Sequence, residues 1–98
     1  MTKDEQLKAF LADINPEIMV ADGLSHAFVG LTYSDGDEIA VYSTERIISN
    51  LMENDLMSFD DAEQYMHQNI LDAYVGKRTP MFIDVIPTEF WTEDTDAI

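Results

Sequence analysis

Histidine is the scarcest of the residue types that could do acid-base chemistry in this chain, with only His26 and His67 present. Ser25 precedes His26, but nucleophilic hydrolysis needs a nucleophile, a base and an orienting group that converge in space. Ser25 and His26 are neighbours in or beside a predicted strand, where successive side chains point to opposite faces. The sequence therefore does not predict a hydrolase triad.

Two groups of acidic residues have a spacing that invites comparison with metal sites. Glu63 and His67 lie four residues apart on a predicted helix with Asp60 nearby, but no third ligand can be identified. Residues 35–38 hold three carboxylates without the spacing of an EF-hand, and the chain has no cysteine for a thiolate site. We predict no metal, no cofactor and no enzyme active site.

The net charge is the strongest signal in the composition. Asp and Glu number 20 against 5 Lys and Arg, which gives a formal charge of −15 over 98 residues. Between Lys8 and Lys77 the only basic residue is Arg46, so most carboxylates lack a partner for an ion pair. Nucleic acids and anionic membranes would be repelled by such a surface, and direct binding to either is not expected.

Length and hydropathy indicate one folded domain. A chain of 98 residues with 46% hydrophobic residues can form a single core, which we place in residues 1–87, with an acidic C-terminal tail over 88–98. No apolar run approaches the roughly 20 residues of a membrane span, and residues 1–8 are polar where a signal peptide would be apolar. We therefore expect a cytoplasmic protein.

The first half of the chain is predicted to form a helix followed by strands. Apolar residues at helical spacing predict a helix over 4–13, and the short apolar run 17–21 predicts a first strand. Alternating apolar residues over 26–33 and 38–43 flank Asp35-Gly36, the strongest short signal of a β-hairpin.

The second half of the chain is predicted to form two helices and a last strand. Thr44 is the predicted cap of a helix that ends near Asn54, and Ser58, with Asp61 in a capping box, begins a longer helix that stops at Gly76. The basic pair 77–78 is expected to interact with the dipole at that helix end. An apolar run predicts a strand over 81–86.

This order predicts an α+β fold: a small, mostly antiparallel sheet of three or four strands with two or three helices on one face. Tyr65, Asn69 and Tyr74 share the inward stripe of the longer helix, where the amide of Asn69 is expected to be hydrogen-bonded. The predicted core comprises Leu31, Ile39, Val41, Ile48, Leu51, Met66, Ile70 and Ile83.

Several short strings resemble a family of small uncharacterised acidic proteins of tailed bacteriophages and prophages. They include Asp22-Gly23, Ala40-Val41-Tyr42 and, most specifically, Ala73-Tyr74-Val75-Gly76 followed by Thr79-Pro80. The resemblance covers residues 14–86 and implies a phage origin without implying an activity. The family has an acidic and aromatic pair where this chain has His67 and Gln68.

Charge and resemblance together suggest a non-enzymatic phage protein that binds and inhibits a host protein through its acidic surface, for example as a mimic of nucleic acid in front of a nucleic-acid-binding protein. The alternative is an accessory or structural module that forms a homodimer or larger homo-oligomer, with acidity that serves solubility only. Phe90 and Trp91 either pack back on the domain or anchor a partner. The predicted partner-binding residues are Glu45, Glu53, Asp55, Asp60, Asp61, Glu63, Asp72 and Trp91.

Overall fold

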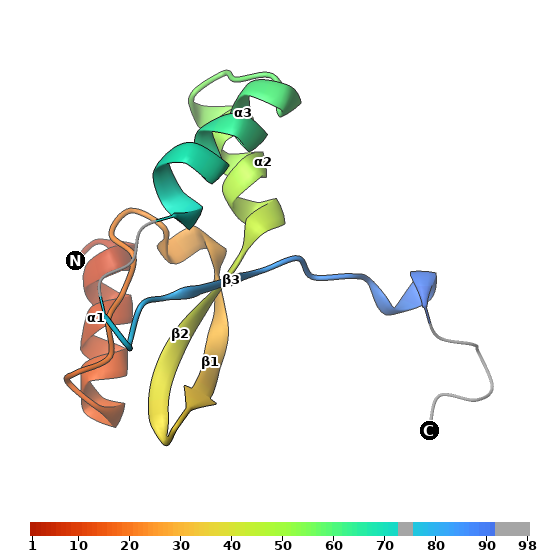
Figure 1. The fold of residues 1–98 in the computed structure, drawn as a ribbon. Helices are drawn as coiled ribbons and strands as arrows, with labels where there is room; N and C mark the ends of the chain where they lie inside the picture. The colour runs from red at the N-terminus through yellow and green to blue at the C-terminus, as the bar shows by residue number, and fades with distance from the viewer. Residues whose placement is uncertain (73–75, 92–98) are drawn as a thin grey trace.

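The chain folds into three α-helices and a three-stranded sheet within residues 1–72 and 76–91, the part described by this computed structural model (Figure 1). The elements in chain order are α1 (Lys3–Ile14), β1 (Phe28–Ser34), β2 (Asp37–Ser43), α2 (Thr44–Asn54), α3 (Phe59–Met66) and β3 (Met81–Ile83). Short 3-10 turns lie at Ser25–Ala27 and Thr88–Phe90, and a π-helical segment, His67–Leu71, follows α3. The predicted α+β class is confirmed.

The hairpin of β1 and β2 is the longest pairing of the sheet. Its turn places Asp35 and Gly36 at φ of 52° and 86°, the two positive values that a tight two-residue hairpin turn requires. The antiparallel register runs from Ser34 opposite Asp37 to Phe28 opposite Tyr42, with a bulge between Phe28 and Gly30. The predicted hairpin is thus confirmed, with a bulge that its alternating pattern did not reveal.

Strand β3 adds to the other edge of β2 in parallel, which gives the sheet order β1-β2-β3. The crossover that joins the two parallel strands carries α2 and α3, which lie side by side at one end of the hairpin in Figure 1. Because β2 is the central strand, every residue from Ile39 to Ser43 is buried.

Tyr42 lies at the centre of the main core. Its ring contacts Phe28 on β1 and Phe82 on β3, with ring centroids 5.7 and 5.8 Å away. Its hydroxyl accepts a 2.9 Å hydrogen bond from the backbone amide of Ala21, and burial raises the pKa of the phenol. The buried residues of this cluster are Ala27, Ala40, Tyr42, Ile47, Leu51, Ala62 and Met66.

Most members of the predicted core are buried or partly buried, but they do not form one core on one sheet face, because Ile39 and Val41 lie on the face opposite the main cluster. Ile39, Val41, Leu51 and Met66 are buried, and Leu31, Ile48 and Ile70 are partly buried against the main cluster. The hairpin register places Leu31 opposite Ala40, so Leu31 shares the face of Ala40 and Tyr42 and not that of Val41. Ile83 is exposed, so its assignment to the core was wrong.

Two predicted strands differ from the structure. Residues 17–21 form no strand, because Ile18 donates to the carbonyl of Asn15 in a turn and Ala21 donates to the Tyr42 hydroxyl instead of joining a ladder. The last strand ends at Ile83 and not at residue 86, since its partner β2 ends at Ser43 where α2 begins.

Helix ends also differ in detail. The side chain of Ser43, not Thr44, caps α2 by accepting from the amide of Arg46 at 3.3 Å. The Thr44 hydroxyl instead donates to the Ile83 carbonyl at 3.2 Å and is also hydrogen-bonded to Asp84, and both bonds tie α2 to the end of β3.

The predicted long helix is α-helical only to Met66. Ser58 caps it by accepting from the Asp61 amide at 3.2 Å, and the backbone then takes π geometry from His67 to Leu71. Tyr65 and Asn69 are exposed, and the Asn69 side chain donates to the Tyr65 carbonyl at 3.2 Å, so the inward placement of both was wrong. Tyr74 lies outside the described residues.

None of the helices within residues 1–72 and 76–91 has the length and apolar character to cross a bilayer.

Candidate protein-binding groove

A groove of about 600 Å³ runs between α2, α3 and the end of β3. Its size is within the range of about 300–1,000 Å³ that is typical of binding pockets. Its lining residues are Thr44, Glu45, Ile48, Ser49, Met52, Phe59, Glu63, Met66, His67, Leu71, Phe82 and Asp84.

The floor of the groove is apolar because two helical stripes face each other across it. The apolar stripe of α2 includes Ile48 and Met52, which lie one turn apart. The apolar stripe of α3 begins with Phe59. Met52 and Phe59 are both exposed although they are large and apolar. An apolar segment of another molecule would find partners for these two side chains here.

The groove carries carboxylates and no Lys or Arg among its lining residues. Glu45 comes from the first turn of α2, Glu63 from the middle of α3 and Asp84 from the residue after β3. All three are exposed, but Asp84 is hydrogen-bonded to Thr44, which leaves Glu45 and Glu63 as the carboxylates of this lining without a hydrogen bond or ion pair in the described part of the chain. The field inside the groove therefore favours a cationic ligand.

The structure brings two of the predicted partner-binding residues, Glu45 and Glu63, into one groove. The other six are exposed but do not line it. Asp60 and Asp61 lie in the first turn of α3, Glu53 and Asp55 at the end of α2, Asp72 after the π-helical segment, and Trp91 beyond β3.

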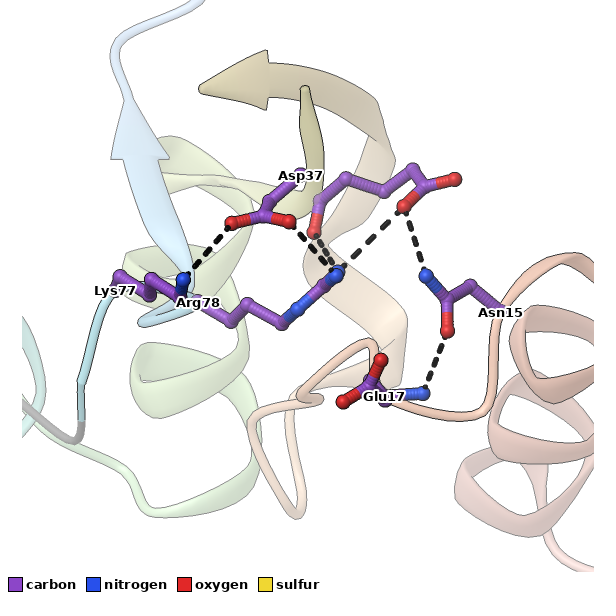
Figure 2. A network of polar contacts seen from close by, with 6 residues as sticks. Asn15, Glu17, Asp37, Lys77 and Arg78 are labelled. Atoms are coloured by element: carbon purple, nitrogen blue, oxygen red, sulfur yellow. Dashed lines mark hydrogen bonds and ion pairs between the residues drawn. The ribbon is translucent and has the colours of Figure 1, made fainter. Parts of the chain in front are cut away.

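The acidic end of the hairpin is organised differently, around Arg78 (Figure 2). The guanidinium lies 3.0 Å from the Asp37 carboxylate and 3.5 Å from that of Glu38, and it donates to the Glu38 carbonyl at 3.2 Å. The side chain of Arg78 is only 14% exposed. Lys77 lies 3.8 Å from Asp37 and is largely exposed.

Glu38 links this network to α1. Asn15, the residue after α1, donates to the Glu38 carboxylate at 3.1 Å and accepts from the Glu17 amide at 3.0 Å. The backbone amide of Glu38, then the Asn15 amide and the Arg78 guanidinium, lower the pKa of the Glu38 carboxyl. Residues 77–78 were expected to interact with a helix dipole and instead form these ion pairs. The same ion pairs involve Asp37 and Glu38, two of the three carboxylates that suggested a calcium site.

A second polar cluster joins α1 to the turn before β1, and the sequence did not predict it. The Asp4 carboxylate accepts hydrogen bonds from the backbone amides of Gly23 and Ser25, and the Ser25 side chain and the Gly23 amide lower the pKa of Asp4. The Nε2 atom of His26 is buried without a hydrogen-bond partner, and burial lowers the pKa of His26. Because Asp4 bonds Ser25 directly and His26 bonds neither, this is an anchor for α1 and not a triad.

Within residues 1–72 and 76–91, no three side chains of His, Asp or Glu come together in a way that could hold a metal ion. Glu63 and His67 both line the groove, but no third ligand joins them.

Residues 84–91, which follow β3, form a C-terminal arm. It extends away from the helices and the hairpin in Figure 1. Phe90 is 76% exposed and Trp91 63%, and the Trp91 indole donates to the Ile86 carbonyl within the arm at 3.0 Å. The interpretation that these two aromatics pack back on the domain is therefore wrong.

Comparison with known proteins gives no further guide to the groove. No protein-family model, curated protein or solved structure matches this chain.

Proposed function

We propose that this chain is a non-enzymatic interaction protein that binds a basic host protein through the groove between α2 and α3. The resemblance to phage proteins supports a role in the cytoplasm of an infected host cell, where binding would inhibit the partner. The partner class that fits best is a nucleic-acid-binding protein, because such proteins present Lys and Arg on the surface used for binding.

One observation carries the proposal: exposed apolar side chains and unpaired carboxylates share the same groove. Met52 and Phe59 offer apolar contact area, while Glu45 and Glu63 offer negative charge without a Lys or Arg in the lining. A surface that served solubility only would have no need of exposed apolar residues between its carboxylates.

Asp60 extends this surface along α3. It lies three residues before Glu63, and residues so spaced on a helix are about 5–6 Å apart. A phosphate occurs every 3.4 Å of axis along each strand of DNA, roughly comparable to this spacing. A groove with an apolar floor adds contacts that a phosphate row cannot make, so the proposed partner carries apolar side chains among its basic ones.

The test begins with capture of partners from host lysate at low salt by the full chain, followed by titration of the captured protein after purification. The variant E45Q/E63Q should weaken binding at least tenfold, and F59S should do so independently. The control variant D13N/E17Q removes the same charge from exposed positions away from the groove and should leave affinity within twofold.

Salt and nucleic acid complete the test. Binding should weaken steeply as salt rises, because charge acts mainly on the association rate and is screened. Nucleic acid should compete with the chain for the partner. A partner that binds equally well at high salt and tolerates E45Q/E63Q and F59S would overturn the proposal.

A further inference from the structure

The sheet has a second face, opposite the main core cluster, on which Ile39 and Val41 are buried and the side chains of β3 are exposed. Tyr42, Ala40 and Phe82 point toward α2 and α3, so their neighbours along β2 and β3 point the other way. Val41 pairs with Met81 on this second face, and Ser43 pairs with Ile83.

Four apolar side chains form an exposed strip on this face. Val29 reaches it from the bulge of β1, Met81 and Ile83 come from β3, and Val85 follows in the arm. Each is between 38 and 45% exposed. Two adjoining hollows of about 350 and 400 Å³ share Val29 and Ile83, so the strip is continuous.

The strip differs from the rest of this acidic surface in its charge. The hollow around Val29 and Met81 has no ionisable residue in its lining. The adjoining hollow has one carboxylate and one guanidinium, Glu45 and Arg46, which carry opposite charges. Two copies of a chain of charge −15 repel each other over most approaches, whereas in the lining of the strip Glu45 is the one carboxylate and Arg46 accompanies it.

A stable dimer needs a larger contact area than the strip alone provides. A stable interface covers about 800 Å² on each partner, and four half-exposed aliphatic side chains supply only part of that area. Phe90 and Trp91 lie in the arm, which extends away from the helices and the hairpin in Figure 1, and most of their surface is exposed. An aromatic side chain can bury about 150–250 Å². The arm is therefore needed to bring the interface toward that size.

We propose that the strip of Val29, Met81, Ile83 and Val85 binds the same strip of a second copy, and that the arm of each copy closes over its partner. A two-fold dimer makes the interface self-complementary, so Arg46 of one copy can meet Glu45 of the other. Glu45 lines the groove as well as this face, whereas Phe59 and Glu63 line the groove and neither hollow of the strip, so variants at Phe59 and Glu63 separate the dimer from the function proposed for the groove.

The test is the mass of the full chain by sedimentation equilibrium from about 1 to 200 µM at two salt concentrations. The expected species is twice the 11.1 kDa monomer. Its dissociation constant should fall as salt rises, because screening removes repulsion between copies. The groove complex should respond to salt in the opposite direction, so the two associations can be told apart.

Two variants locate the interface. M81E places a charge in the strip, and F90S/W91S removes the aromatics of the arm; each should raise the dimer dissociation constant at least tenfold. The arm variant changes no residue of the core, so it tests the interface even where M81E unfolds. The control F59S alters an exposed residue of the groove and should leave the dimer intact.

Three outcomes would overturn the proposal. One is a monomer at every concentration and salt, and another is a dimer that is unchanged by both variants. The third is that M81E and F90S/W91S still form the dimer but no longer capture a host protein. That result would show that this surface binds a different partner.

Discussion

The two acidic regions of this molecule, the hairpin end around Arg78 and the groove between α2 and α3, use the same side chains in opposite ways. Asp37 and Glu38 lie against a nearly buried guanidinium and tie β2 to the segment before β3. Glu45 and Glu63 line a groove whose lining includes no Lys or Arg. The comparison shows that a net charge of −15 is not one uniform property, because one region uses carboxylates for folding and the other leaves them available.

The largest expected effect is the loss of the cation at the hairpin end. Arg78→Met leaves Asp37 and Glu38 without their guanidinium in a partly buried place, and we expect a loss of about 2–3 kcal/mol in the free energy of unfolding. Urea unfolding measures this loss. Lys77→Met is the matched control, since the Lys77 side chain is 85% exposed, and should cost less than about 0.5 kcal/mol. Equal effects of the two substitutions would remove the distinction between the regions.

Neutralising one acid in each region should give effects of opposite sign. Asp37→Asn removes an ion pair and should lower the free energy of unfolding by about 1–2 kcal/mol, whereas Glu63→Gln relieves repulsion and should raise it by up to about 0.5 kcal/mol. The same urea experiment compares the two variants. A loss of stability in Glu63→Gln would show that the groove carboxylate is compensated.

Acid should destabilise the chain in two stages. Burial lowers the pKa of His26 in the folded state, so the unfolded chain binds the proton first and stability falls as the pH drops below about 6.5. The pKa values of Asp4 and Glu38 are lowered, so the stability that they contribute is present above their ordinary range and is lost as the pH falls through it, below about 4.5.

Thermal melts between pH 8 and pH 3 check both stages. His26→Gln should abolish the first decline and keep the second, because it leaves the carboxylates unchanged. His67→Gln alters an exposed residue of the π-helical segment and serves as the control. A first decline that persists in His26→Gln would contradict the assignment.

The smallest expected effect is that of salt on wild-type stability. Several hundred millimolar monovalent salt should raise the melting temperature by a few degrees, because unpaired carboxylates repel one another over about 8–10 Å near physiological ionic strength. The rise should shrink in E45Q/E63Q and remain in D13N/E17Q. An equal rise in both variants would place the repulsion outside the groove.

The sequence predicts what local chemistry determines. Asp35-Gly36 defines the hairpin turn because few other pairs adopt two positive φ values, and Ser58 defines the start of α3 through its hydroxyl. The apolar run 17–21 misleads because strand formation depends on a partner strand. No strand of the sheet pairs with it in the described residues, and Ala21 bonds the Tyr42 hydroxyl instead.

The site depends on contacts between distant residues, which no local pattern contains. Arg78 contacts Asp37 only because β3 returns to β2, and Glu45 and Glu63 line one groove only because α2 and α3 pack side by side. Acidic residues at helical spacing did indicate two of the groove carboxylates. The apolar floor was missed because Met52 and Phe59 look like core residues until the packing of the two helices is known.

The parallel pairing of β3 also has a consequence for how the chain folds. Val41 and Met81 pair although 40 positions separate them, whereas the turn of the hairpin joins neighbours. Closing a long loop costs more entropy than closing a tight turn, and hairpins form in about 1–10 µs. The hairpin should therefore fold early and β3 should dock last, held by three residue pairs. Amide hydrogens of Met81–Ile83 should then exchange with solvent through local opening well before those of the hairpin, and each opening exposes the edge of β2 to any other strand nearby.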